Sequence, residues 1–191
     1  MQHRVLVTRI LFATDVHGSE QCFRKFVNAA KYKTYKASVA ILSGDITGKT
    51  IVPIMRMPDG SCRAEVPGKI IGAEHKATNE EELKGLEKII RDAGYYPYVT
   101  SEDEIAEFKA DRSKVDVLMK RFMLETAESW IRLAEERLRG TDVKFILTPG
   151  NDDILEIDEI INKSDYVVNA EGKCVMIDDE HEMVTSGYTN P

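Results

Sequence analysis

Five polar residues in three short clusters have side chains that could bind a divalent metal ion: Asp15, His17, Asp45, Asn151 and Asp152. An aspartate and a histidine two positions apart can direct a carboxylate and an imidazole at one point. Asp45 follows a glycine, which has no side chain, so a metal ion or a phosphate can approach the backbone there closely. Carboxylate, imidazole and amide oxygen suit ions such as Mn, Fe or Zn better than a thiolate-seeking metal.

Each cluster follows an apolar run that predicts a β-strand. Residues 5–14, 39–42 and 143–147 are rich in large and β-branched apolar side chains. The first run predicts a central strand that is buried on both faces. Ser19 can cap a helix, and apolar residues at helical spacing predict that helix over residues 19–34. Strand, helix and strand in this order predict a right-handed parallel βαβ unit, whose strands end where α/β proteins bind ligands.

The chain between the second and third strands is much longer than one crossover needs. Residues 50–74 predict a β-hairpin around an Asp-Gly turn, and residues 79–93 predict a helix. The longest helical pattern covers residues 102–139. We expect one α/β domain, 1–191, with an insert at about 48–100 that is either a cap over the site or an oligomer contact.

Composition excludes several classes of partner and location. The net charge of −7 gives no basic footprint for a nucleic acid. No apolar run approaches the roughly 18 residues of a membrane span. The three cysteines are far apart in the sequence, which favours free thiols in a reducing compartment. We therefore expect a soluble, cytoplasmic protein without a membrane partner.

The three clusters, in this order and after strands, resemble the motifs of calcineurin-like metallophosphoesterases. That family has Asp-x-His, then Gly-Asp, then Gly-Asn-His-Asp or Gly-Asn-His-Glu, and later a lone His and Gly-His-x-His. The first three are matched here by Asp15–Gly18, Gly44–Asp45 and Gly150–Asn151. The resemblance implies an α/β fold in which a β-sandwich is flanked by helices. It also implies two divalent ions that activate a hydroxide for attack on a small phosphorylated substrate.

The resemblance assigns a role to each of the five residues. By it, Asp15 and His17 bind the first ion. Asp45 bridges both ions, and Asn151 binds the second. Asp152 stands where the family has a histidine that assists the leaving group. It could take that catalytic role only as an acid with a raised pKa, so we expect a preference for phosphodiesters or good leaving groups over monoesters.

The downstream histidine motifs are absent, since the one later histidine is His181 in an acidic stretch. We therefore expect a sandwich that is incomplete at its C-terminus and a second ion that is weakly held or missing. Either the chain is a metal-dependent phosphoester hydrolase, or it is a truncated or degenerate, non-catalytic module. Such a module would bind a metal or a phosphate and would need a missing half or a partner. An open sheet edge would favour a homodimer.

Overall fold

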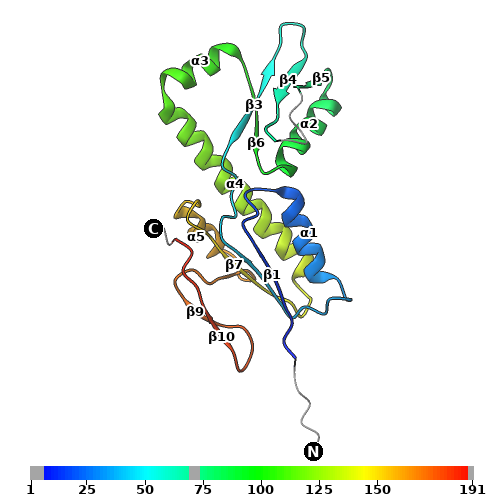
Figure 1. Cartoon of the computed structure of the whole chain (residues 1–191), viewed down its shortest axis with the longest axis vertical. Helices are drawn as coiled ribbons and strands as arrows, with labels where there is room; N and C mark the ends of the chain where they lie inside the picture. Colours follow the sequence, from blue (N-terminus) through cyan, green and yellow to red (C-terminus); the bar gives the residue numbers. More distant parts are fainter. Residues whose placement is uncertain (1–6, 69–73, 189–191) are drawn as a thin grey trace, which may run out of the picture.

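The computed structural model describes residues 7–68 and 74–188. In this part of the chain, five helices and three sheets form a mixed α/β protein (Figure 1). One four-stranded sheet lies with helices α1, α4 and α5, and the second lies beyond the start of α1 with helices α2 and α3 (Figure 1). None of the helices in these two ranges is both long enough and apolar enough to cross a membrane.

The first sheet holds four parallel strands in the order β1-β2-β7-β8. Their bounds are β1 Ile10–Thr14, β2 Val39–Ser43, β7 Lys144–Thr148 and β8 Val168–Asn169. Helix α1, Glu20–Lys31, joins β1 to β2, which confirms the predicted parallel βαβ unit. Thr14, Ser43 and Thr148 lie side by side in register, so these three strands end level. The loops that follow them therefore start from one edge of the sheet.

The prediction that the first strand is central and buried on both faces is wrong. Strand β1 begins at Ile10 and lies at the edge of the sheet within the described ranges, and residues 5 and 6 lie outside them. Leu11 and Ala13 pack on the core, whereas Ile10 and Phe12 on the other face are 49% and 60% exposed. Side chains alternate along a strand, and apolar character alone does not reveal whether a second layer covers the outer face.

The core of this layer lies between the first sheet and three helices: α1, α4 (Arg112–Leu138) and α5 (Glu156–Ile161). Phe23 of α1 stacks on Trp130 of α4, with ring centroids 4.2 Å apart. The Trp130 indole donates a hydrogen bond to the Glu20 carboxylate at 2.6 Å. These buried aromatic contacts fix α1 against α4. They also fix the direction in which the β1–α1 loop leaves the sheet.

The single helix predicted over residues 102–139 is in fact two helices. Helix α3 spans Glu102–Ala110, and α4 begins at Arg112. Asp111 between them has an extended backbone, and its carboxylate accepts a hydrogen bond from the Ser113 N–H at 3.0 Å. An aspartate in this position satisfies a free N–H group of the next helix. An N-cap inside the predicted helix therefore divides it.

The insert forms a second sheet in the order β5-β4-β3-β6. Its strands are β3 Ile51–Arg56, β4 Cys62–Glu65, β5 Glu74–Ala77 and β6 Tyr96–Thr100. Strands β3 and β4 are the predicted hairpin, and α2, Glu80–Asp92, is the predicted helix. The parallel pairing of β6 with β3 was not predicted. Leu86 and Ile90 of α2 pack on this sheet, which gives the insert a core of its own.

Two short strands follow β8: β9 (Cys174–Met176) and β10 (Glu182–Val184), paired as an antiparallel hairpin. Three apolar side chains from this segment pack on the face of the first sheet opposite the helices: Val175, Ile177 and Met183. This part of the molecule therefore has three layers, namely a hairpin, a parallel sheet and helices. The structure establishes a mixed α/β fold, whereas a metallophosphoesterase-like sandwich goes beyond what these strands establish.

Candidate metal centre

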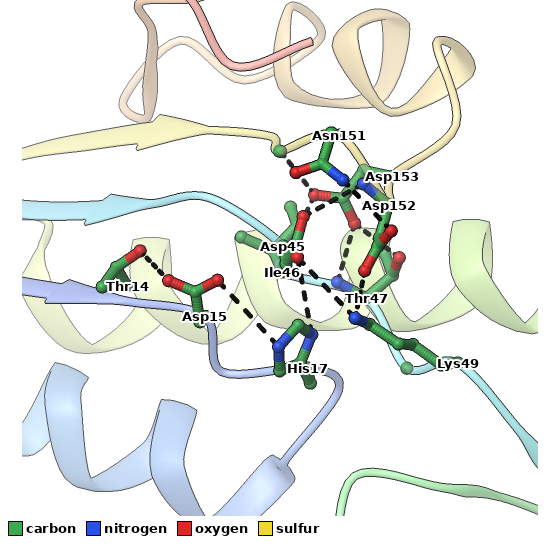
Figure 2. A network of polar contacts seen from close by, with 12 residues as sticks. Thr14, Asp15, His17, Asp45, Ile46, Thr47, Lys49, Asn151, Asp152 and Asp153 are labelled. Atoms are coloured by element: carbon green, nitrogen blue, oxygen red, sulfur yellow. Dashed lines mark hydrogen bonds and ion pairs between the residues drawn. The ribbon is translucent and has the colours of Figure 1, made fainter. Parts of the chain in front are cut away.

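The loop after β1 presents Asp15 and His17 at the edge where the three strands end (Figure 2). Both residues have a positive φ, 54° and 43°, in the left-handed region that non-glycine residues rarely occupy. The N–H of His17 donates to the Asp45 carbonyl, and the N–H of Gly18 donates to the Ile46 carbonyl, each at 2.9 Å. The strained backbone persists because the loop after β2 holds it in place.

The side chains of Asp15, His17 and Asp45 form a cluster in which one ligand atom from each lies within 4.8 Å of the others. His17 Nε2 is 4.0 Å from an Asp15 oxygen, and Nδ1 is 3.9 Å from an Asp45 oxygen. These distances are too long for hydrogen bonds, and Nδ1 is buried without a hydrogen-bond partner. An ion binds a single nitrogen of an imidazole, and three ligand atoms within 4.8 Å of one another can reach one divalent ion with bonds of about 2.1 Å after a small side-chain shift. In residues 7–68 and 74–188 no other carboxylate, histidine or cysteine cluster has this spacing.

Two neighbouring loops set the position of the Asp45 carboxylate, which belongs to a residue only 7% exposed. Its Oδ1 atom accepts a hydrogen bond from the Asp152 N–H at 3.0 Å. A Cβ on Gly150 would lie 2.2 Å from the Asp45 backbone nitrogen, so only glycine allows the loop after β7 to approach. Gly44 has a φ of 70°, which turns the chain out of β2.

Asp153 is a buried carboxylate to which the sequence analysis assigned no role. Its Oδ2 atom accepts hydrogen bonds from the N–H groups of Ile46 and Gly150, at 2.9 and 2.8 Å. Its Oδ1 atom accepts from the N–H and the hydroxyl of Thr47, at 2.8 and 2.5 Å. Asp153 therefore joins the loop after β2 to the loop after β7. The one signal in the sequence was the aspartate doublet, which does not reveal that Asp152 turns outward and Asp153 inward.

Lys49 is a second residue of the site for which the sequence analysis predicted no role. Its ammonium forms an ion pair with the Asp152 carboxylate and lies 3.8 Å from Asp45 Oδ2. The hydrogen bond to Asp152 raises the pKa of Lys49, and the same bond lowers the pKa of Asp152. Asn151 donates a hydrogen bond to the other Asp152 oxygen at 3.2 Å. Lys49 follows Asp45 by four residues, but a Thr-Gly-Lys loop has no fixed geometry that would predict this contact.

Of the five predicted site residues, the structure brings three into a cluster that could hold a metal ion and places two beside it. Asn151 and Asp152 contact each other. The Asp152 carboxylate accepts a hydrogen bond from Lys49, so it is an anion rather than a proton donor in this arrangement. The metal-binding role of Asn151 and the catalytic role of Asp152 stay predictions.

Comparisons of the chain with protein-family models, with curated proteins and with solved structures found no match. Any functional assignment therefore depends on the motifs and on the geometry of the site alone. The geometry supports one divalent ion on a carboxylate–imidazole–carboxylate cluster, with an ammonium group beside it.

Proposed function

We propose that this chain is a metal-dependent phosphoester hydrolase of the calcineurin-like metallophosphoesterase type. Its substrate would be a small phosphorylated molecule, and a phosphodiester rather than a monoester. The observation that carries the proposal is the cluster of Asp15, His17 and Asp45, with a buried, unpartnered imidazole nitrogen facing a carboxylate. The cluster lies just past the carboxyl ends of parallel strands, where α/β sheets bind ligands. The order of the three motifs along the chain supports the same family.

The layers of the fold also support the proposal. Helices α1, α4 and α5 cover one face of the parallel sheet, and the β9–β10 hairpin covers part of the other. In the proposed assignment, this hairpin belongs to the second sheet of a metallophosphoesterase-like sandwich. Ile10 and Phe12 are exposed on the face of β1 away from the core, where further strands of such a sheet would fit.

A divalent ion on the cluster would lower the pKa of a bound water and polarise a phosphoryl oxygen. The residues of the chain would hold the ion and shape its surroundings. Asp15, His17 and Asp45 would hold the ion, and the buried Asp45 carboxylate is positioned by the loop after β7. Asp153 keeps that loop joined to the loop after β2. Lys49 adds a positive charge beside the cluster.

The hydrolysis of bis-p-nitrophenyl phosphate with Mn²⁺ tests the proposal. Asp45→Asn keeps the shape of the side chain and removes the ligand charge. We expect its rate to fall by at least about 100-fold, because metal assistance contributes several kcal/mol to transition-state stabilisation. Asp116→Asn, on the exposed surface of α4, makes the same change of charge and should keep the wild-type rate. An undiminished rate in Asp45→Asn, or an equal loss in both variants, would contradict the proposal.

A non-catalytic module that binds a metal or a phosphate is the second candidate. The pairing of Asp152 with Lys49 favours it, since that carboxylate is ionised where the family has a group that assists the leaving group. In this case a calorimetric titration would show Mn²⁺ binding to the wild type and not to Asp45→Asn, while neither protein hydrolyses the ester. The titration and the rate assay on the same samples separate the two candidates.

A further inference from the structure

Lys49 extends from the loop after β2 to the carboxylates beside the metal cluster (Figure 2). Its ammonium is paired with Asp152 and lies 3.8 Å from Asp45 Oδ2. The same Asp45 oxygen lies 3.9 Å from Nδ1 of His17. One carboxylate oxygen therefore faces the proposed metal position on one side and an ammonium group on the other.

Carboxylate oxygens that a second ion would need are already engaged. One Asp152 oxygen accepts a hydrogen bond from the Asn151 amide nitrogen, and the other is paired with Lys49. The remaining oxygen of Asp45, Oδ1, accepts a hydrogen bond from the Asp152 backbone. His17 Nδ1, in contrast, is buried and has no hydrogen-bond partner. The structure thus has one position with an unsatisfied ligand and a neighbouring position whose carboxylate oxygens already hold a hydrogen bond or an ion pair.

The charges of the site favour one ion together with the ammonium. Asp15, Asp45 and Asp152 carry three negative charges, while the nearby Asp153 carboxylate already accepts four hydrogen bonds. One divalent ion and the Lys49 ammonium supply three positive charges, which balance the three carboxylates. A second divalent ion would add two more positive charges beside the first ion and the ammonium, where like charges repel strongly.

We propose that Lys49 takes the place of a second metal ion: next to a single ion on the three-residue cluster, its ammonium binds a phosphoryl oxygen of the substrate. This inference rests on the proposed function, because it adds a substrate-binding group to the same site. The Lys49 side chain is 51% exposed and has a flexible stem, so it turns from Asp152 to an incoming anion without backbone movement. Lysine binds phosphate as a point charge and needs no second donor in a fixed fork.

The test uses Mn²⁺ and inorganic phosphate as probes on the full chain. A calorimetric titration gives the number of Mn²⁺ ions per chain. Broadening of the phosphorus NMR resonance by bound Mn²⁺, with the chain in excess over the metal, gives the affinity for phosphate next to the ion. The variants are Lys49→Met, which removes the charge and keeps an unbranched side chain of similar length, and Lys49→Arg, which keeps the charge. Lys88→Met is the matched control, because Lys88 pairs with Asp92 on α2 and not with a cluster residue.

We expect one Mn²⁺ per wild-type chain. Phosphate affinity should fall at least about tenfold in Lys49→Met, since a charge-assisted hydrogen bond to the phosphate is lost. It should stay within about threefold of wild type in Lys49→Arg, and it should be unchanged in Lys88→Met. The rescue by arginine separates loss of charge from a change in packing.

Several results would overturn the inference and leave the hydrolase proposal standing. These are two Mn²⁺ ions per wild-type chain, an unchanged phosphate affinity in Lys49→Met, or a loss in Lys49→Arg or Lys88→Met as large as in Lys49→Met. A wild-type chain that binds no Mn²⁺ would overturn both the hydrolase proposal and the inference.

Discussion

The replacement of Asp153 by asparagine tests how the two loops of the site are held together. The carboxylate accepts hydrogen bonds from four donors, whereas the asparagine amide has one acceptor oxygen and one donor nitrogen. If the amide nitrogen faces Ile46 and Gly150, both N–H groups lose their acceptor. If it faces Thr47, the hydroxyl can turn and accept, but the Thr47 N–H loses its acceptor. In either orientation at least one buried donor is left unsatisfied.

The size of the effect follows from this count. Each unsatisfied buried donor costs about 1–3 kcal/mol, and the remaining hydrogen bonds lose their charge assistance. We expect Asp153→Asn to lower the free energy of unfolding by about 3–5 kcal/mol. Asp152→Asn makes the same chemical change one residue earlier, in a side chain that is 36% exposed and pairs with an exposed lysine. Its effect should stay below about 1 kcal/mol.

Urea unfolding measures the change in unfolding free energy of both variants. The signals are circular dichroism and the fluorescence of Trp130, the one tryptophan of the chain. A calorimetric Mn²⁺ titration of the folded variants measures the second consequence, a weaker metal affinity in Asp153→Asn, because the loop that carries Asp45 is no longer fixed. If Asp153→Asn destabilises the protein no more than Asp152→Asn does, the four hydrogen bonds do not hold the loops together and the reasoning is wrong.

Two further predictions concern the surroundings of the site. Gly150→Ala places a Cβ 2.2 Å from the Asp45 nitrogen, so the Mn²⁺ affinity measured by calorimetry should fall at least about tenfold. Gly85→Ala is the control, because the space around Gly85 is open, and it should leave that affinity unchanged. Burial raises the pKa of Tyr96 from 10.0 to about 12, so the neutral phenol stabilises the fold below about pH 10, and that contribution is lost as the pH rises toward 12. The Tyr96 hydroxyl accepts a hydrogen bond from the Gly48 N–H, and Tyr96→Phe removes that hydroxyl. The difference in unfolding free energy between wild type and Tyr96→Phe should therefore shrink between about pH 8 and pH 11. A difference that grows over this range would contradict the sign.

The convergence of Asp15, His17 and Asp45 was predictable because it depends on strand topology alone. Parallel strands with helical crossovers place their carboxyl ends on one side of the sheet. The roles of Asp153 and Lys49 depend instead on how two loops fold on each other across the site. Such contacts leave no period or spacing in the sequence, so residue type alone did not distinguish these two from ordinary surface charges.

The fold shows the same division between local pattern and tertiary context. The helices α1 and α2 were predicted because an N-cap and an apolar period are local signals. The edge position of β1 and the parallel pairing of β6 with β3 were missed, since pairing depends on the path of the chain between strands. The predicted homodimer would use the outer edge of β1, which no described residue pairs with, and it stays a prediction.

Three glycines lie where the loop after β1, the loop after β2 and the turn after α2 cross. A Cβ on Gly18 would lie 2.6 Å from the Gly48 Cα, and a Cβ on Gly94 would lie 2.4 Å from the His17 carbonyl oxygen. The insert is therefore in direct contact with the backbone of a proposed metal ligand. Any movement of α2 relative to the parallel sheet must either move His17 or break this contact. The contact therefore couples the insert to the site, while the two roles that the sequence left open for it, a cap over the site or an oligomer contact, stay predictions.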